Sequence, residues 1–531
     1  LEDLHAEDLD EISVQLTRHY QEAGDAARAV EQYMAAGGRA RRLYANLEAL
    51  GHFNRALSLS DTPSDDLTRE RAEVLIELYR GEQAVEDYEQ LLKSARGEGN
   101  RPAELEALLG LGRGHYIISL DHPETGAAES SLKHYDEAHE LAVELSDKAG
   151  VIRSRVPTIW FTDFWAEYEQ QARVNAEQAY EASRAIDDEQ LRLEADLAMF
   201  YTDPSAERPA RGRVLLEELE AQGNLSRLNY LLFGMMFVTL GTGDLEETVE
   251  LCDRGIAVAA RIGVPPVQYP TIRGIALARL GRIDQSLASL DNEVADEAHR
   301  LGRAFREVGR AILHMELQDY SSTVRILDED RPLIEELARA WMQDTMHLLL
   351  TRAASKGRLL DKMSLDSTLE YLDVREPSTS DMSLRGMRSP TASLALAEYA
   401  LATGEPGRAL ELADEAEDRA RGHGRRPETV MALELIARIR ISEGDWEAAL
   451  QAAHTGVELA NEIGYRPMLW QLLGLKAKAL DGLQQTEEAG QARSQAAEVI
   501  LAIADTVSDE GLRATFVASP AASDVLEQSK S

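Results

Sequence analysis

The sequence contains a single cysteine, Cys252, and no long apolar run. One cysteine excludes an internal disulfide framework and fits a reducing compartment, so we expect a cytoplasmic protein. Cys252 also occupies a small-residue position of the repeat described below, which favours a buried apolar role. Even the apolar segment 230–240 is shorter than the roughly 18 residues that a membrane span requires. The sequence therefore predicts no membrane association.

Lysine is scarce as well. Only 8 of the 56 basic residues are lysine, and 94 acidic residues give the chain a net charge of −38. Because such a surface repels phosphate groups, we expect no direct binding of nucleic acid. Many carboxylates with few lysines are typical of proteins from a high-salt cytoplasm. An ordinary acidic protein from a genome rich in G and C has the same composition, so both origins stay open.

The motifs of common catalytic sites are missing. The sequence has no Gly-Lys pair, hence no P-loop, and no G-x-S-x-G nucleophile elbow. The glycine-rich run from Gly110 to Gly114 lies within a helical pattern and follows no strand, which favours helix packing over nucleotide binding. His134 and His139 are five residues apart, whereas a helical zinc pair is four apart with a glutamate beside it. We therefore expect no enzyme activity, cofactor or metal in this segment.

What the sequence does contain is a 40-residue repeat, clearest in residues 391–480. A shift of 40 places Gly404 on Gly444 and Gly424 on Gly464. Alanines keep the same register: Ala392, Ala397, Ala409 and Ala413 fall on Ala432, Ala437, Ala449 and Ala453. Helical periodicity fills the intervals, and glycine is a typical helix stop. A fixed period of this size indicates an architecture of stacked repeats.

The unit resembles the tetratricopeptide repeat, whose first helix carries W-x2-L-G-x2-Y and whose second carries A-x3-F-x2-A. Trp470-x2-Leu473-Gly474-x2-Ala477 is similar to the first pattern. Ala84-x3-Tyr88 and Ser131-x3-Tyr135-x2-Ala138 are similar to the second. The resemblance implies an all-α, right-handed superhelical solenoid of about a dozen helical hairpins, with a concave face lined mainly by first helices.

Near the start of the chain we assign the helices by the same patterns. Residues 12–23 fit a first helix, and Ala29-x3-Tyr33-x2-Ala36 fits the second helix of that hairpin. Ala49-x3-Phe53-x2-Ala56 repeats the second-helix pattern, which predicts a shortened first helix before it.

One polar segment, 375–390, interrupts the pattern with two prolines and no apolar periodicity. We interpret it as a linker or hinge between an array over 1–374 and a three-hairpin array over 391–505. Residues 187–373 match the signature poorly, so the hairpins expected there rest on periodicity alone. Residues 506–531 are expected to form a capping helix and a tail, because the open end of an array needs a polar-faced cover.

Aromatic side chains gather in residues 160–168. Trp160, Phe164, Trp165 and Tyr168 are candidates for a recognition surface, because aromatic rings offer large, rigid contact areas. The alternative is that they form local core between irregular hairpins.

Arginines on this acidic background form a second candidate. Arg208, Arg211 and Arg213 could bind an anionic ligand or an acidic partner surface through paired hydrogen bonds. Similar clusters occur at residues 39–42 and 419–426. The alternative is ion pairing with the many neighbouring carboxylates within and between repeats.

The two ends of the chain have a more particular resemblance. His19-Tyr20 with Gly24-Asp25, and Gly511-Leu512-Arg513-x2-Phe516, are similar to the C-terminal helical-repeat region of large ATP-binding signal-transduction regulators of the maltose-activator and cyclase-linked type. The resemblance implies a non-catalytic sensor of a transcription-regulating or signalling ATPase, which binds a protein or peptide in its concave groove.

The chain opens at Leu1 in mid-pattern, so we expect a fragment whose ATPase core lies upstream. A small-molecule inducer, a homo-oligomer and a free-standing scaffold that assembles a protein complex remain alternatives.

Overall fold

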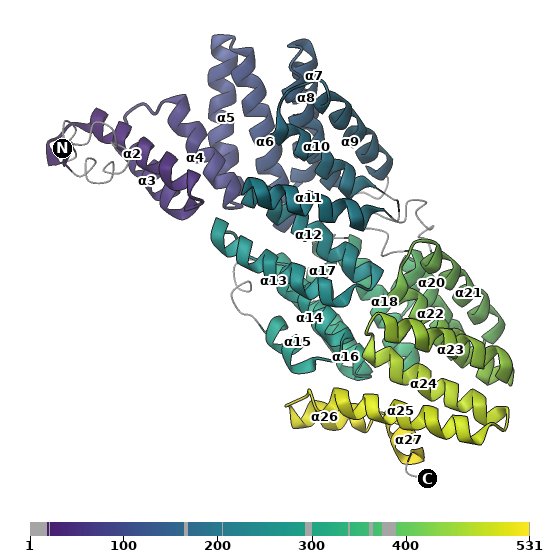
Figure 1. Ribbon diagram of the computed structural model, residues 1–531. Coiled ribbons are helices and arrows are strands. Elements are labelled where there is room, and N and C mark those ends of the chain that lie inside the picture. Colours follow the sequence, from purple (N-terminus) through teal and green to yellow (C-terminus); the bar gives the residue numbers. More distant parts are fainter. Residues whose placement is uncertain are drawn as a thin grey trace. The chain divides into compact units, whose positions relative to one another are not determined.

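The computed structural model describes residues 19–529 apart from residues 21, 164–167, 204, 206, 292–299, 338–339, 361–364 and 374–388. Every regular element among these residues is a helix, which confirms the predicted all-α solenoid of helical hairpins (Figure 1). Within the same residues, no helix has the length and apolarity needed to cross a membrane.

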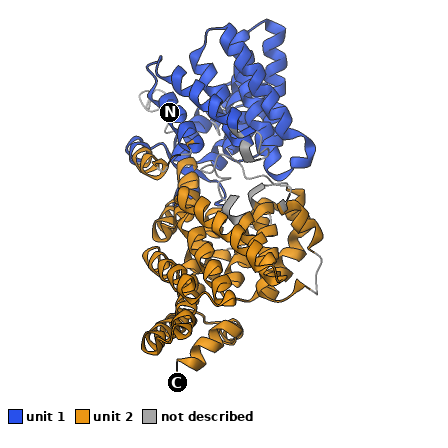
Figure 2. Ribbon diagram, turned by 90° about the vertical axis from the view of Figure 1, so that its right-hand side faces the viewer, with its two compact units in different colours: residues 1–202, 217–229, 257–266 blue, residues 203–216, 230–256, 267–531 orange. Residues whose placement is uncertain are grey.

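The chain divides into two compact units (Figure 2). Unit 1 comprises residues 1–202, 217–229 and 257–266, and unit 2 comprises residues 203–216, 230–256 and 267–531. The helices of unit 1 are α2 (Ala26–Arg42), α3 (Asn46–Ser58), α4 (Asp65–Glu77), α5 (Gly81–Glu98), α6 (Arg101–Asp121), η2 (Pro123–Thr125), α7 (Ala127–Glu144), α8 (Lys148–Arg155), η3 (Val156–Asp163), α9 (Glu169–Ser183) and α10 (Glu189–Thr202).

The next three helices have residues in both units: α11 (Arg208–Gln222), α12 (Leu225–Thr242) and α13 (Leu245–Ile262). The remaining helices belong to unit 2: α14 (Tyr269–Arg279), α15 (Ile283–Leu290), α16 (Arg300–Glu316), α17 (Tyr320–Glu336), α18 (Ala340–Lys356), α19 (Asp366–Asp373), α20 (Ser389–Ala402), α21 (Pro406–Gly422), α22 (Arg426–Glu443), α23 (Trp446–Glu462), α24 (Arg466–Gly482), α25 (Thr486–Ala504), α26 (Glu510–Val517) and α27 (Pro520–Gln528).

Left-handed residues end helices at the spacing of the sequence repeat. The φ angle is +87° at Gly404 and +77° at Gly444. At the third repeat the equivalent position is Gln484, with φ of +64°. A side chain is disfavoured in this region, so Gln484 makes the same turn at some conformational cost. The 40-residue period therefore exists in the backbone as well as in the sequence.

The same period continues through the middle of the chain, where the sequence signature is weak. Gly223, Gly243 and Gly263 have φ angles of +67°, +83° and +72°, and each follows the previous one by 20 residues. These glycines separate α11, α12, α13 and α14. The hairpins expected there from helical periodicity are thus present, and the glycine spacing is a signal for them that the side-chain pattern lacks.

Within a hairpin, a glycine of the first helix lies under a large side chain of the second. A Cβ on Gly112 of α6 would stand 2.8 Å from Cε1 of Tyr135 on α7. The Ser131 hydroxyl donates to the Gly112 carbonyl oxygen at 2.5 Å, which adds a hydrogen bond to the same crossing. In unit 2, Ser286 donates to the Gly274 carbonyl at 2.7 Å. Small residues permit this close approach of two helices, which is the packing that the tetratricopeptide pattern predicts.

One helix assignment made from the sequence is wrong. Helix α2 was expected to be a second helix, but it packs as the first helix of a hairpin with α3. Gly37 of α2 lies against Phe53 of α3, at the position where a first-helix glycine meets a second-helix aromatic ring. No shortened helix is needed before α3. The error arose because the alanine-rich α2 fits both patterns, and Tyr33-x2-Ala36-Gly37-x2-Ala40 has the first-helix spacing.

The domain boundaries predicted from the sequence can be compared with the structure only in part. Residues 374–388, nearly the whole expected linker, lie outside the described residues, and Ser389 begins α20. The division into arrays over 1–374 and 391–505 stays a prediction. The expected cap and tail over 506–531 contain two helices, α26 and α27. Phe516 of α26 packs edge-on against Trp470 of α24, with 6.2 Å between the ring centroids.

Candidate interaction surface

A row of charged side chains crosses the first helices of unit 1. Its members come from α2, α4, α6 and α8 and are only partly buried: Arg41, Glu70, Glu73, Glu77, Glu106, Arg113 and Arg153. We call this set the first-helix row. Small and apolar positions of α6 pack both against α7 and against α5 of the preceding hairpin, and the charged residues lie beside them.

Ion pairs join the row from helix to helix. Arg113 of α6 binds Glu73 of α4 through two hydrogen bonds of 3.0 and 2.6 Å. Arg41 of α2 contacts the same helix, at 3.1 Å from Glu70 and 3.5 Å from Glu73. Further along, Arg153 of α8 binds Glu106 of α6 at 2.6 and 2.5 Å. Paired guanidinium–carboxylate contacts of this kind fix the orientation of both side chains.

Glu73 is the electrostatic centre of the row. Burial by itself would raise the pKa of the Glu73 carboxyl. The charge and hydrogen bonds of Arg113, a hydrogen bond from the Tyr88 hydroxyl and the charge of Arg41 outweigh that effect and lower this pKa to about 2. Burial raises the pKa of Tyr88, whose hydroxyl donates to Glu73 at 2.5 Å. Glu73 is therefore an anion at every physiological pH.

In unit 2 the first helices carry charges that are buried. Glu398 of α20 has 2% of its side chain exposed, and Glu434 of α22 has 4%. Lys356 of α18 lies 3.5 Å from Glu398 and 3.3 Å from Glu434. Arg438 of α22 lies 2.5 Å from Glu398 and 2.9 Å from Glu434. Arg352 of α18 completes the set, 3.8 Å from Glu398. We call these five residues the buried charge network.

Burial by itself would raise the pKa of Glu398. The charges of Arg438, Lys356 and Arg352, with a hydrogen bond from Arg438, outweigh it and lower the pKa to about 2. The network holds three cations and two anions, and the nearby Glu316 carboxyl also interacts with Arg352 and Lys356. Removing one anion would leave buried cations without compensation.

A second buried group lies at the ends of α14 and α16. The Tyr465 hydroxyl donates to Glu316 at 2.5 Å, and Arg279 stands 5.5 Å above the Tyr465 ring. Burial raises the pKa of Glu316, although Arg279 and Tyr465 oppose this shift. Tyr465 precedes α24, 149 residues after Glu316, so this contact joins distant parts of the chain within unit 2.

The aromatic candidates of residues 160–168 contact other residues of unit 1 where they are described. Trp160 is partly buried, and its ring meets Tyr201 edge-on with 4.3 Å between centroids. Tyr168 packs edge-on against Phe161 at 6.0 Å and accepts a hydrogen bond from Asn175 at 3.1 Å. Phe164 and Trp165 lie outside the described residues. A recognition role for this group stays a prediction.

The arginine candidates lie in unit 2 and behave differently from one another. Arg208 is 1% exposed and therefore does not offer its guanidinium to solvent. Arg211 pairs with Asp203 at 2.8 Å, and Arg213 binds Glu247 through two hydrogen bonds of 2.8 and 2.6 Å. Both retain partly exposed side chains. Ion pairs of Arg211 and Arg213 with nearby carboxylates are what the alternative interpretation of this cluster expects. Anion recognition by these arginines stays a prediction.

Apart from Arg41, which lies in the arginine cluster at residues 39–42, no residue of the first-helix row or of the buried charge network was singled out from the sequence. A signal for both exists in the 40-residue spacing. Glu73 and Arg113 are 40 residues apart, and so are Glu398 and Arg438. Opposite charges at equivalent positions of adjacent repeats indicate a contact between the repeats. The sequence comparison followed apolar and glycine positions only, so it missed this charge complementarity.

Comparison with known proteins assigns no family. No protein family and no curated protein match the chain. Among solved structures, it is similar to the APC/C hetero-tetramer Cut9–Hcn1, with 12% identity over 94% of this chain and 96% of the other and a TM-score of 0.47. It is also similar to the P58(IPK) TPR domain, with 12% identity over 94% and 99% of the two chains and a TM-score of 0.24. These scores carry no argument, so the description as a tetratricopeptide-like array rests on the hairpin packing.

Proposed function

We propose that the chain is a protein-interaction module and that the first-helix row of unit 1 is its recognition surface. The observation that carries this proposal is that the row is ordered by ion pairs yet remains partly exposed. Side-chain exposure is 32% for Arg113, 34% for Arg153 and 44% for Glu106. Charged groups already held in place lose little freedom when a partner binds, which favours affinity.

The chemistry of the row suits a peptide segment that bears charges of both signs. Arg41, Arg113 and Arg153 alternate with carboxylates along four helices, so a partner could exchange ion pairs with each in turn. Trp160, on the 3-10 helix that follows α8, stays a separate aromatic candidate. We assign no catalytic role, cofactor or metal to it.

A charge reversal tests this surface. Arg153→Glu should abolish capture of a stoichiometric protein partner from an extract of the source organism, because it places a like charge against Glu106 and against the partner. Arg69→Glu is the matched control, since Arg69 is exposed and pairs only with Asp66 on the same helix among the described contacts. Equal capture by both variants would disprove the surface, as would failure of wild type to capture any partner.

On the resemblance stated above, we further propose that the module is the sensor region of a larger ATP-binding regulator. A small-molecule inducer would then act with the protein partner. The alternative is a free-standing scaffold, including one that self-associates. A nucleotide-binding core encoded upstream of Leu1 would support the sensor. A stable complex indifferent to nucleotide and small molecules, with no such core upstream, would support the scaffold.

A further inference from the structure

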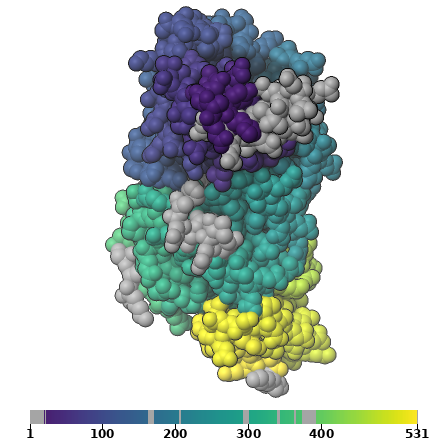
Figure 3. Space-filling model, turned by 90° about the vertical axis from the view of Figure 1, so that its left-hand side faces the viewer, coloured from purple at the N-terminus to yellow at the C-terminus, as the bar shows by residue number. Residues whose placement is uncertain are grey.

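Two hairpin turns in the middle of unit 2 pack against turns of the C-terminal helices. The first lies between α12 and α13, at residues 241–244, and meets residues 425–427 and Ile463. The second lies between α14 and α15, at residues 280–284, and meets residues 464–466 and 503–508. We call these contacts the turn interface. In Figure 3 the yellow C-terminal residues adjoin the teal residues of the middle of unit 2.

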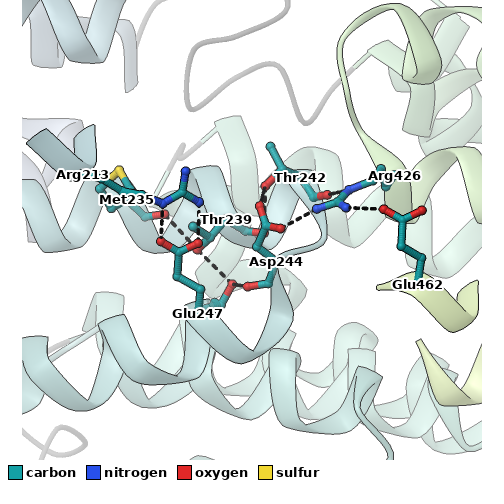
Figure 4. A network of polar contacts seen from close by, with 9 residues as sticks. Arg213, Met235, Thr239, Thr242, Asp244, Glu247, Arg426 and Glu462 are labelled. Carbon is teal, nitrogen blue, oxygen red and sulfur yellow. Dashed lines mark hydrogen bonds and ion pairs between the residues drawn. The ribbon is translucent and has the colours of Figure 1, made fainter. Parts of the chain in front are cut away.

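At the first turn, one arginine makes most of the polar contacts (Figure 4). Arg426 donates to the Thr242 carbonyl oxygen, lies 2.5 Å from Asp244 and lies 3.0 Å from Glu462. Its side chain and that of Asp244 are about one-third exposed, at 29% and 34%. Water and salt can therefore compete for these contacts, and each contributes modestly to stability.

At the second turn, backbone groups take part directly. Ile283 and Asp284 are the first residues of α15, so their amides have no acceptor within the helix. The Ile283 amide donates to Thr506 Oγ1 at 3.1 Å, and the Asp284 amide donates to the Thr506 carbonyl oxygen at 3.0 Å. In return, the Ser508 amide donates to Asp284 Oδ1 at 2.8 Å.

Small apolar contacts accompany the polar ones. A Cβ on Gly243 would stand 3.2 Å from Ile463 and from Pro427. A Cβ on Gly281 would stand 3.1 Å from Ile503. The turn interface is thus made by the ends of hairpins together with Ile283, Ile463 and Ile503, which belong to one buried hydrophobic cluster that continues across both turns. The stability of a repeat array comes mainly from contacts between neighbouring repeats, whereas the turn interface joins repeats that are far apart in the sequence.

We propose that the turn interface is a reversible closure of unit 2, which opens as one cooperative element and then exposes Arg279 and Glu316. These two residues lie directly inside it. Tyr465, which binds Glu316 and covers Arg279, stands between Gly464 and Arg466 of the second turn contact. When the turns separate, Tyr465 leaves with α24, and the Arg279 guanidinium and the Glu316 carboxyl become exposed to solvent.

Amide hydrogen exchange tests the closure in the full chain. The amides of Ile283 and Asp284 are protected only while Thr506 accepts from them, so they report the second turn. Arg426→Gln weakens the first turn without touching these amides. If the interface opens as one element, exchange of a peptide covering residues 280–287 should accelerate by roughly tenfold, the effect of losing a partly exposed charged hydrogen bond.

Arg421→Gln is the matched control, because Arg421 is exposed and pairs with Glu417 on its own helix. It should leave exchange at residues 280–287 unchanged. Asp244→Asn is a second variant that should act in the same direction as Arg426→Gln. Amides within the core of α22, residues 433–439, should stay protected in all variants, which separates opening of the interface from unfolding.

Salt provides an independent measurement. Raising NaCl from about 0.1 to about 1 M shortens the screening length from roughly 10 to roughly 3 Å. Exchange at residues 280–287 should accelerate in the wild type and respond less in Arg426→Gln. The proposal is overturned if Arg426→Gln changes exchange only near residue 426. Equal acceleration of residues 280–287 and 433–439 would also overturn it, because the interface would then open only when unit 2 unfolds.

Discussion

Gly37 and Phe53 are in direct contact across the first described hairpin of unit 1. A Cβ on Gly37 would stand 2.5 Å from Cε1 of the Phe53 ring, closer than any real Cβ contact. The next residue, Gly38, has only Arg42 nearby, at 3.8 Å. Two adjacent glycines of one helix therefore have opposite reasons for being present.

We expect alanine to act oppositely at these two positions. Gly37→Ala should destabilise α2 and α3 by about 1–3 kcal/mol, because the Phe53 ring must move. Gly38→Ala should stabilise them by about 0.5–1 kcal/mol, since it removes a glycine from a helix interior without a clash. Hydrogen exchange of the α3 amides measures both effects locally. A stabilising Gly37→Ala would show that the ring can move freely.

Glu398→Gln should destabilise unit 2 by about 3–5 kcal/mol, because it removes one of two anions that compensate the buried side chains of Lys356 and Arg352 and the partly buried Arg438. Glu415→Gln is the control, an exposed residue paired with Arg419 on its own helix, and should cost about 0.5 kcal/mol or less. Urea unfolding followed by circular dichroism measures both. Adding Lys356→Met to Glu398→Gln should recover part of the loss. Strictly additive effects would mean that the two residues do not interact.

Unit 1 should lose stability as the pH falls below about 6.5. His115 of α6 and His134 of α7 stack at 5.3 Å between ring centroids. Burial lowers the pKa of both rings, and for His134 the nearby His115 lowers it further. A lowered pKa in the folded state means that the unfolded chain binds protons first. The contribution of the neutral histidine pair to the stability of unit 1 is therefore complete above the ordinary histidine pKa. It is lost as the pH falls below that value.

His134→Asn should reduce this pH dependence. The measurement is the temperature at which the α6 and α7 amides lose half of their protection from hydrogen exchange, compared between pH 7.5 and pH 5.5. His454→Asn, at an exposed position on α23 of unit 2, is the control. An unchanged pH dependence in His134→Asn would show that the stacked pair does not cause the acid sensitivity.

Cys252 should not react with a thiol reagent in the folded protein. Its side chain is fully buried, and the thiol lies 3.8 Å from the Met236 sulfur. Burial raises its pKa well above the ordinary cysteine value, and only the thiolate is nucleophilic. Titration with Ellman's reagent should find no reactive thiol in the native state and one in urea. Rapid reaction of Cys252 in the native protein would mean that the helices around it separate often enough to admit the reagent.

Features governed by neighbouring repeats could be predicted from the sequence. Gly404, Gly444 and Ser131 follow local rules, because a left-handed turn favours glycine and a close helix crossing requires a small residue. The role of α2 was predicted wrongly, since an alanine-rich helix satisfies both helix patterns. Only the contact of Gly37 with Phe53 decides between them.

Contacts between distant repeats could not be predicted in this way. Arg426 meets Asp244 across 182 residues of sequence, and Thr506 meets Gly281 across 225. No periodic signal connects these positions, because they depend on how many hairpins separate the two turns. The charge pair of Glu398 with Arg438 lies between adjacent repeats. Its spacing of 40 residues equals the repeat period, so the sequence does contain a signal for it.

Helices α26 and α27 cover an apolar face of the hairpin formed by α24 and α25. Phe516 packs on Trp470, and Val525 lies where a Cβ on Gly474 would meet it at 3.3 Å. Without these two short helices, the end of the array would present an apolar face of the kind that each repeat offers to its successor. Such a face can accept another copy head to tail, and an association of that type has no natural end. Helices α26 and α27 thus replace such a contact between copies by a contact within one chain.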